Sequence, residues 1–384
     1  MGIEKRIRAE LTALESQAQF RRVEVVRGVN LVSNDYLGLA TDPRMRQAVL
    51  DAVQAAPRVA STGSRLLSGH DEAWDALERE FARWIGADAA LYFTSGYAAN
   101  LGLLSALLRP EDVVFSDSAN HASLIDGLRL SKCRRVIFPH RDLNVLEDEL
   151  GRRGAGPGER FIVVESIFSM EGDRAPLADL AGLAARHGAA LIVDEAHATG
   201  VCGPNGRGCI AEAGLSGRIF ATVHTCGKAL AAAGAFVCGS ESLRQFLINR
   251  ARPFIFNTAL PPYFAAQVAT GMRLAAAAEE ERAQLHVLSN FLRQELRAAG
   301  FDTAASDSQI VPVILGDNAS TLAIASRLQG RGFGVRAIRP PSVPHGAGRL
   351  RVSVNARHSQ SQLAEFAAAL LEIRMERATA HAAL

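Results

Sequence analysis

The stretch AALIVDEAHATG (residues 189–200) decides the fold class. Its first part, Ala189–Val193, is apolar without interruption, which is typical of a strand that helices bury on both faces. Asp194 then ends the strand with a carboxylate, which is costly to bury unless a cation or a strong donor meets it. A pyridinium nitrogen would be such a partner. Capping of a following helix by Asp194 is the alternative interpretation.

Similar short apolar runs recur along the chain, with helical patterns between them. This alternation predicts an α/β fold with a mostly parallel sheet, whose ligands bind beyond the carboxyl ends of the strands. Glu165, Asp194 and Lys228 all lie at or just after such ends, so we expect them to meet at one edge of the sheet. The runs are Ala89–Phe93, Asp112–Ser116, Arg135–Phe138, Phe161–Glu165, Ala190–Asp194, Ile219–His224 and Ala235–Cys238.

The pattern changes after about Pro261 and predicts a second, smaller α+β domain. Its expected elements are a long helix over Tyr263–Ala299, strands Ile310–Leu315 and Arg349–Val354, and a final helix over Gln360–Arg377. We therefore divide the chain into an N-terminal helix and arm (1–40), a large domain (41–265) and a small C-terminal domain (266–384).

Composition excludes several classes of partner. The 384 residues include 42 Lys and Arg against 40 Asp and Glu, and the formal charge of +2 gives no electrostatic footprint for nucleic acid or anionic lipid. The N-terminal segment lacks the apolar core of a signal peptide, and no apolar run approaches the length of a bilayer span. The cysteine number is odd, and none forms a C-x-x-C pair, which favours reduced thiols in a cytoplasmic protein. The cysteines are Cys133, Cys202, Cys209, Cys226 and Cys238.

The common site signatures are absent from the sequence. No G-x-G-x-x-G follows a predicted strand, and Gly227-Lys228 lacks the upstream glycine of a P-loop. Neither G-x-S-x-G nor H-E-x-x-H occurs. His121, His197 and the cysteines do not fall at zinc spacings, so we predict no metal.

Lys228 is the second unusual residue at a strand end. It closes the segment TCGK (225–228) after the next apolar strand, 34 residues (228 − 194) beyond Asp194. That separation fits one further helix and strand, so both groups emerge at the same edge. A desolvated lysine loses its charge readily and becomes a nucleophile for a Schiff base. A lysine that extends to solvent is the alternative.

Three polar loops complete the pattern. TSGYAAN (94–100) is a small-residue turn that opens a helix, the usual seat for a phosphate. SANHAS (118–123) and ESIFSMEGD (165–173) follow two other predicted strands. Each loop alone is a weak signal, and a single histidine in a loop is more often structural than catalytic.

Taken together, these segments resemble the fold-type-I pyridoxal-phosphate (PLP) enzymes and, within them, the α-oxoamine synthases. The resemblance covers about residue 15 to about residue 372, and it implies a large seven-stranded, mostly parallel sheet domain with a smaller C-terminal domain. The matching segments are SNDYLGL (33–39), GSRLLSG (63–69), NHAS (120–123), FSMEGD (168–173), DEAHATG (194–200), TCGK (225–228) and RLR (349–351).

The resemblance implies a role for each site residue. Lys228 would carry PLP, Asp194 would hold the pyridine nitrogen, His197 would bond the ring oxygen and His121 would stack on the ring. The other cofactor residues would be Gly96, Tyr97 and Thr225 at the phosphate, with Glu165 and Ser169 nearby. The family's shared sites imply a homodimer, with Phe254–Pro262 reaching the partner's phosphate.

Substrate residues also follow from the resemblance. Arg351 would receive an amino-acid carboxylate. AIRPPSVP (337–344), with Arg339 and Ser342, and Arg21 resemble members that join L-alanine to a pimeloyl thioester for biotin biosynthesis. Arg21 as a solvated helix charge is the alternative reading of that residue. The stretch from Phe20 to Ser33 is shorter than usual, and Ala231–Ala233 replaces residues that are often glycine or serine.

Three alternatives stay open at this point. The first is a sibling synthase that uses glycine or serine. The second is a different PLP reaction, such as a transaminase or an aldolase. The third is a non-catalytic partner subunit that keeps the fold for assembly.

Overall fold

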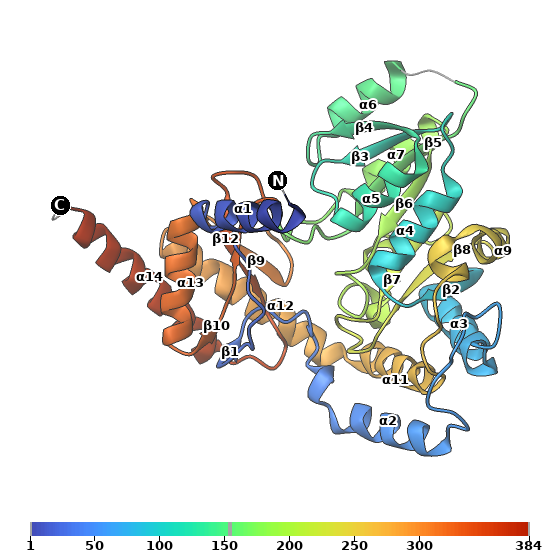
Figure 1. The fold of residues 1–384 in the computed structure, drawn as a ribbon, viewed down its shortest axis with the longest axis horizontal. Helices are drawn as coiled ribbons and strands as arrows, with labels where there is room; N and C mark the ends of the chain where they lie inside the picture. The colour runs from blue at the N-terminus through green and yellow to red at the C-terminus, as the bar shows by residue number, and fades with distance from the viewer. Residues whose placement is uncertain (1, 153–155, 383–384) are drawn as a thin grey trace. The chain divides into compact units, whose positions relative to one another are not determined.

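The computed structural model describes residues 2–152 and 156–382, which divide into two compact units (Figure 1). The larger unit comprises Asn34–Ser169 and Arg174–Ala283, and the smaller comprises Met1–Ser33, Met170–Asp173 and Gln284–Leu384.

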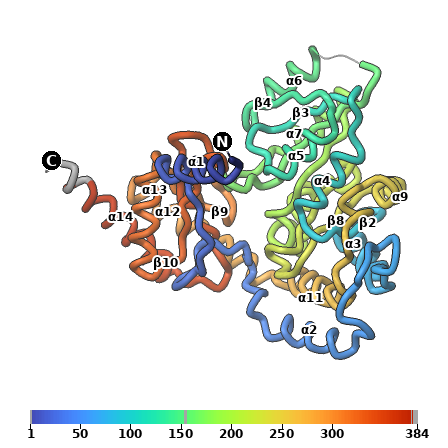
Figure 2. The backbone as a smooth tube through the Cα atoms, in the orientation of Figure 1, coloured from blue at the N-terminus to red at the C-terminus, as the bar shows by residue number. Residues whose placement is uncertain are grey.

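These bounds differ from the predicted division near residues 40 and 265, and two packing contacts explain the difference. Helix α11 (Tyr263–Ala277) packs against α2 (Pro43–Ala55) of the larger unit. Strand β1 (Val29–Asn30) pairs with β10 (Phe333–Gly334), which joins the N-terminal arm to the C-terminal elements (Figure 2).

The larger unit is built on the predicted seven-stranded sheet, in the order β2-β8-β7-β6-β5-β3-β4. Strand β8 runs antiparallel to both of its neighbours, and the remaining pairs are parallel, so the α/β prediction is confirmed. The strands are β2 (Ala89–Phe93), β3 (Val113–Asp117), β4 (Arg134–Phe138), β5 (Arg160–Glu165), β6 (Ala190–Asp194), β7 (Ala221–Thr225) and β8 (Ala235–Gly239).

Helices cover both faces of this sheet, which is why its strands are apolar throughout. On one face, Leu91, Val163 and Val223 belong to a core cluster with residues of α4 and α9. On the opposite face, Phe236 stacks on Phe81 of α3 at a ring separation of 3.8 Å. The helices of this unit are α2, α3 (Glu72–Ile85), α4 (Gly96–Leu107), α5 (Ala122–Ser131), α6 (Leu143–Arg152), α7 (Leu177–Arg186), α8 (Cys209–Glu212), α9 (Glu241–Arg250), α10 (Arg252–Ile255) and α11, with 3-10 turns at Leu39–Thr41 and Pro204–Gly206.

The smaller unit has a three-stranded antiparallel sheet in the order β11-β12-β9, with helices around it. Both predicted strands and the final helix are present. Its elements are α1 (Ile3–Ser16), β1, β9 (Ile310–Gly316), α13 (Asn318–Gly330), β10, β11 (Ala337–Ile338), β12 (Gly348–Ser353) and α14 (Gln360–Ala382).

The helix predicted over Tyr263–Ala299 is in fact two helices. Ala278 leaves the helical region (φ −85°, ψ 51°) between α11 and α12 (Glu279–Ala298). Three consecutive glutamates, Glu279–Glu281, open α12. Because acidic side chains stabilise a helix N-terminus, this run favours a new helix start over continuation. Among the described residues, no helix combines the length and the hydropathy that crossing a bilayer requires.

Candidate active site

A pocket of about 290 Å³ lies at the carboxyl ends of the parallel strands of the larger unit. Residues that follow five strands line it, as expected for ligand sites of parallel sheets. Glu165, Asp194 and Lys228 do meet at this edge. The lining residues that bear on the chemistry are Asn34, Gly96, Asn100, His121, Ser123, Glu165, Asp194, His197, Thr225 and Lys228.

Lys228 lies in direct contact with His197. Its Nζ is 2.8 Å from His197 Nε2, and His197 Nδ1 is 2.6 Å from the hydroxyl of Tyr36. The Tyr36 hydroxyl in turn donates to Asn34 Oδ1 at 3.0 Å. Because the Tyr36 hydroxyl gives its hydrogen to Asn34, its oxygen accepts from His197 Nδ1–H, and Nε2 of a neutral His197 then accepts from Lys228 Nζ. The chain of hydrogen bonds therefore fixes the lysine amine at the pocket.

Asp194 is the buried carboxylate of the pocket, with 5% of its surface exposed. Its Oδ2 accepts from Asn100 Nδ2 at 2.6 Å, and its Oδ1 accepts from the backbone N–H of Ala196 at 2.8 Å. The contact with Ala196 corresponds to helix capping, the alternative role considered for Asp194. Residues 196–200 form turns, however, so no helix begins there. Two neutral donors thus hold the Asp194 carboxyl group at the edge of the pocket.

His121 is oriented by two polar residues that the sequence did not assign to the site. Its Nδ1 is 2.8 Å from Ser123 Oγ and accepts from the Ser123 backbone N–H at 3.2 Å. Asn100 Nδ2 donates to Ser123 Oγ at 2.9 Å, which leaves the serine hydroxyl to donate to His121. A neutral His121 therefore carries its proton on Nε2.

Electrostatics keeps that imidazole neutral. Burial in the pocket lowers the pKa of His121 below its usual 6.5, with a smaller upward effect from Asp194 and a downward one from Lys228. In the sequence, Asn100 stands out only as a polar amide within the largely apolar stretch GYAANLGLLSAL. Nothing local indicates that its partner, Asp194, lies 94 residues away.

The N-terminus of α4 offers the predicted phosphate seat. Ser95 caps the helix by accepting from Ala98 N–H at 3.1 Å. A Cβ at Gly96 would lie 2.4 Å from Thr225 Cγ2, so only glycine lets the end of β7 approach this turn. The Tyr97 hydroxyl donates to Asp126 of α5, a residue that does not line the pocket. Thr225 Oγ1 donates to the Ala196 carbonyl at 3.3 Å.

Glu165 and Ser169 are both buried. Glu165 ends β5 and lines the pocket, next to Asp194 in the sheet register. Ser169 lies in the segment after β5 and is not among the residues that line the pocket in the described part of the chain. Its cofactor contact stays a prediction.

The predicted substrate residues Arg21, Arg339, Ser342 and Arg351 all belong to the smaller unit. Arg21 and Arg339 line one pocket of about 690 Å³ there. Arg339 donates to the carbonyls of Ala18 and Phe20, and burial together with Arg21 lowers its pKa. Arg351 is buried on β12 and donates to Ser353 Oγ at 2.7 Å, while Ser342 is exposed.

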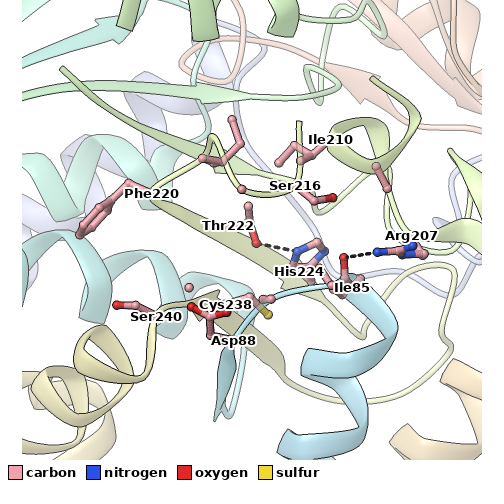
Figure 3. A pocket seen from close by; sticks show the side chains of 16 residues that line it. Ile85, Asp88, Arg207, Ile210, Ser216, Phe220, Thr222, His224, Cys238 and Ser240 are labelled. Carbon is pink, nitrogen blue, oxygen red and sulfur yellow. Dashed lines mark hydrogen bonds between the residues drawn. The ribbon is translucent and has the colours of Figure 1, made fainter. Parts of the chain in front are cut away.

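A second pocket of the larger unit, of about 340 Å³, lies at the amino ends of β2 and β7 (Figure 3). Cys238 and His224 are buried titratable residues of its lining. Thr222 Oγ1 lies 2.8 Å from His224 Nε2 and Thr199 Oγ1 lies 2.9 Å from His224 Nδ1. Burial lowers the pKa of His224 to about 3. None of the residues predicted for the site lines this pocket.

A seven-stranded, mostly parallel sheet with a buried aspartate after one strand and a lysine after the next defines a fold-type-I PLP-dependent transferase. The family model described as aminotransferase class I and II matches residues 26–370, and the chain belongs to that family. It is 45% identical to the 8-amino-7-oxononanoate synthase of Anaeromyxobacter dehalogenans over 380 residues, which are 96% of this chain and 95% of that protein. The resemblance stated from the motifs is confirmed.

Solved structures agree with this assignment. An 8-amino-7-oxononanoate synthase from Francisella tularensis is 28% identical with a TM-score of 0.78, covering 91% of this chain and 99% of that one. A serine palmitoyltransferase variant from S. paucimobilis, solved with a bound PLP-myriocin aldimine, is 30% identical with a TM-score of 0.89, covering 97% and 98%.

The pocket residues fit PLP by their chemistry. Lys228 supplies a primary amine for an aldehyde, and Asp194 supplies a buried anion for a ring cation. The α4 N-terminus supplies N–H donors for a phosphate, at a turn that a Cβ on Gly96 would fill.

Proposed function

We propose that this chain is a PLP-dependent acyltransferase that condenses L-alanine with a pimeloyl thioester. The products are 8-amino-7-oxononanoate, the free thiol and CO2, and the pathway is biotin biosynthesis. The observation that carries the proposal is the convergence of Lys228, His197, Asp194 and His121 on one pocket. The extensive identity to synthases of that name supports the substrate pair.

PLP, when bound, supplies an electron sink that makes the alanine Cα proton acidic. Asp194 holds negative charge where a protonated ring nitrogen needs it, and Asn100 keeps that carboxylate in place. Lys228 Nζ removes the Cα proton and later returns one. His197 and Tyr36 orient the amine for both transfers through the hydrogen bonds described above.

His121 acts on the second substrate. Its Nε2–H, fixed by Ser123, donates a hydrogen bond to the thioester carbonyl oxygen as negative charge develops there. The lowered pKa keeps His121 neutral. Its Nδ1 can then accept from Ser123, and only Nε2 carries a proton. This donor stabilises the addition step, after which the thiol leaves.

Carboxylate recognition would fall to the three arginines that the motifs single out. Arg351 would receive the alanine carboxylate by a bidentate contact. Arg21 and Arg339 lie close enough for their charges to interact, and in the described residues neither forms an ion pair with an acidic side chain. Such a pair suits the distal carboxylate of a pimeloyl chain.

A serine palmitoyltransferase-type activity is the second candidate, because solved structures of that enzyme superpose with the higher TM-score. Its palmitoyl chain ends in a methyl group and gains nothing from an arginine pair. The Arg21 and Arg339 pocket therefore favours the dicarboxylic substrate.

We further propose a cytoplasmic homodimer that shares its active sites. Leu66 and Leu67 of the segment GSRLLSG are 48% and 82% exposed, and a second subunit over them would remove apolar surface from water. The free, buried cysteines are compatible with a reducing compartment.

The test is thiol release from pimeloyl-CoA by PLP-loaded protein, with L-alanine, glycine or L-serine supplied in parallel. Release with L-alanine alone is expected. Release with glycine or serine instead would transfer the proposal to a sibling synthase, and no release from a protein that binds PLP would overturn the reaction class.

A further inference from the structure

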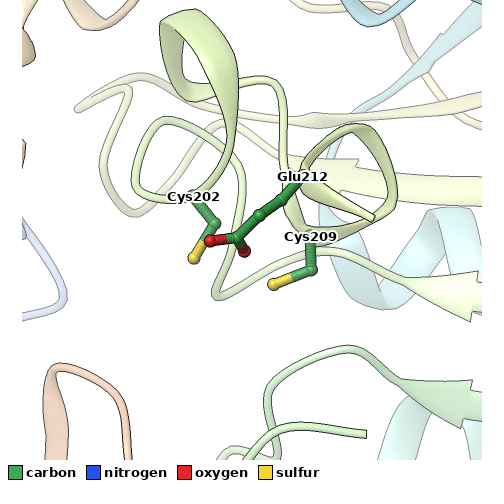
Figure 4. Close-up of side chains that lie close together, drawn as sticks. All are labelled: Cys202, Cys209 and Glu212. Carbon is green, nitrogen blue, oxygen red and sulfur yellow. The ribbon is translucent and has the colours of Figure 1, made fainter. Parts of the chain in front are cut away.

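Two buried cysteines lie side by side in the loop that follows the Asp194–Gly200 segment, outside the groups that the proposed reaction uses. The sulfur atoms of Cys202 and Cys209 and a carboxylate oxygen of Glu212 all lie within 4.8 Å of one another (Figure 4). Both thiols are free, and the residues are only 4% and 5% exposed.

The backbone of the loop fixes this proximity. The N–H of Gly208 donates to the Cys202 carbonyl at 2.8 Å, so the two ends of the loop are adjacent. Gly203 and Gly208 have φ of 72° and 104°, which side chains rarely adopt. A Cβ at Gly203 would also lie 2.4 Å from the Gly208 carbonyl oxygen. The glycines therefore make a tight loop that holds the two sulfurs together.

Arg174 gives the two thiols different chemistry. Its Nη2 donates to Cys202 Sγ at 3.6 Å, while its Nη1 pairs with Glu212 at 2.7 Å. Of the two sulfurs, Cys202 Sγ is the one that receives the guanidinium N–H. The hydrogen bond to Cys202, with burial, raises the pKa of Cys209 well above its usual value, so Cys209 keeps its proton. Cys202 is therefore the sulfur placed to attack.

A metal ion would suit this cluster less well. It would find only three ligands here among the described residues, whereas a structural zinc ion takes four. It would also compete with the guanidinium of Arg174 for the Glu212 carboxylate. The ligand number and the Arg174–Glu212 ion pair therefore favour two thiols that react with each other.

We propose that Cys202 and Cys209 are a redox-active pair that hydrogen peroxide converts to an intrachain disulfide. Cys202 Sγ attacks one peroxide oxygen, so that an S–O bond forms, the O–O bond breaks and one water leaves. Cys209 Sγ then attacks Cys202 Sγ, so that the S–S bond forms, the S–O bond breaks and a second water leaves. The two thiols lose two electrons and two protons, and a dithiol reductant reverses the change.

The experiment treats reduced, PLP-loaded protein with a small excess of hydrogen peroxide and then alkylates the remaining thiols under denaturing conditions. Trypsin cuts after Arg207, between the two cysteines, so they fall in separate peptides, 187–207 and 208–218. The proposal expects these peptides to be joined in a non-reducing digest and separated by dithiothreitol. Cys226 and Cys238, which are almost fully buried, should remain alkylatable.

Matched variants assign the roles. Cys202→Ser and Cys209→Ser should each abolish the joined peptide, and Cys209→Ser should leave a sulfenic acid on Cys202 that dimedone traps. Arg174→Gln should slow joining several-fold, with Arg174→Lys between it and the parent. The proposal is overturned if both cysteines stay alkylated after peroxide, or if zinc co-purifies at one ion per chain and is lost from both serine variants.

Discussion

Two of the pockets in the larger unit lie at opposite ends of its strands, and they differ in what their polar groups can do. At the carboxyl ends, Lys228 and His121 face a pocket of about 290 Å³. At the amino ends, the larger pocket of about 340 Å³ contains His224, whose two ring nitrogens are both engaged by threonine hydroxyls. Pocket size and a buried histidine therefore do not identify the site; donors directed at a ligand do.

The parallel sheet produces this asymmetry. Loops that leave the carboxyl ends begin helices there, so N–H groups and polar loop residues collect at that edge. At the amino ends the chain enters the sheet, and in this protein it brings apolar residues such as Ile219 and Phe220. Catalytic chemistry should thus respond to changes at the first pocket, and stability to changes at the second.

The largest effect should come from Lys228→Ala. Loss of the amine removes both the cofactor link and the base, so thiol release with L-alanine should fall by at least about a thousandfold. A substitution in the other pocket, Cys238→Ser, is the matched control and should leave kcat within about twofold after correction for folded protein. Comparable losses in both variants would erase the distinction between the pockets.

Asp194→Asn should follow. The amide keeps the size of the side chain but removes the negative charge, so kcat should fall about a hundredfold. The visible spectrum of bound PLP should shift at the same time, since the ring nitrogen loses its anionic partner. An unchanged kcat would mean that Asp194 serves only as the local cap of the Ala196 N–H.

His224 should make stability depend on pH. Its folded pKa of about 3 lies below the ordinary 6.5, so the unfolded chain binds more protons between these values. Stability due to this group is complete above pH 6.5 and is lost as pH falls; at pH 5 the loss is about 2 kcal/mol. Urea unfolding at pH 7 and pH 5 measures it, and His224→Gln should flatten the difference. A parent and variant with equal pH dependence would contradict the assignment.

The smallest effect should come from Ser123→Ala. Loss of the hydroxyl removes one of two hydrogen bonds that keep His121 Nδ1 unprotonated, equivalent to roughly 1 kcal/mol or about a fivefold drop in kcat. KM for L-alanine should hardly change, and Ser123→Thr should restore most of the rate. A KM effect without a kcat effect would assign Ser123 to substrate binding instead of positioning.

The sequence predicted what depends on local pattern. Strands such as Ala89–Phe93 and Ala190–Asp194 were located to the residue, because apolar runs bounded by polar loops leave little freedom. The edge at which Asp194 and Lys228 meet followed from the direction of parallel strands. The sequence did not predict that β8 runs antiparallel to its neighbours, because its apolar run is compatible with either direction.

Contacts between distant segments were beyond the sequence. The Tyr36 hydroxyl reaches His197 across 161 positions, and Asn100 reaches Asp194 across 94. The pairing of Cys202 and Cys209 was also missed, because a spacing of six intervening residues has no signature until glycines fold the loop back on itself. Tertiary packing determines each of these contacts, and the periodicity of the sequence does not indicate it.

The central claim is that Lys228 is the reactive amine, and one measurement tests it most directly. Lys5, Lys132 and Lys228 are the only lysines of the chain. Borohydride reduction of the PLP-loaded protein, followed by peptide mass mapping, fixes the cofactor on whichever lysine it occupies. A phosphopyridoxyl group is expected on Lys228 at one per chain, with Lys5 and Lys132 unmodified. A label on either of those two, or bound PLP that no lysine retains, would contradict it.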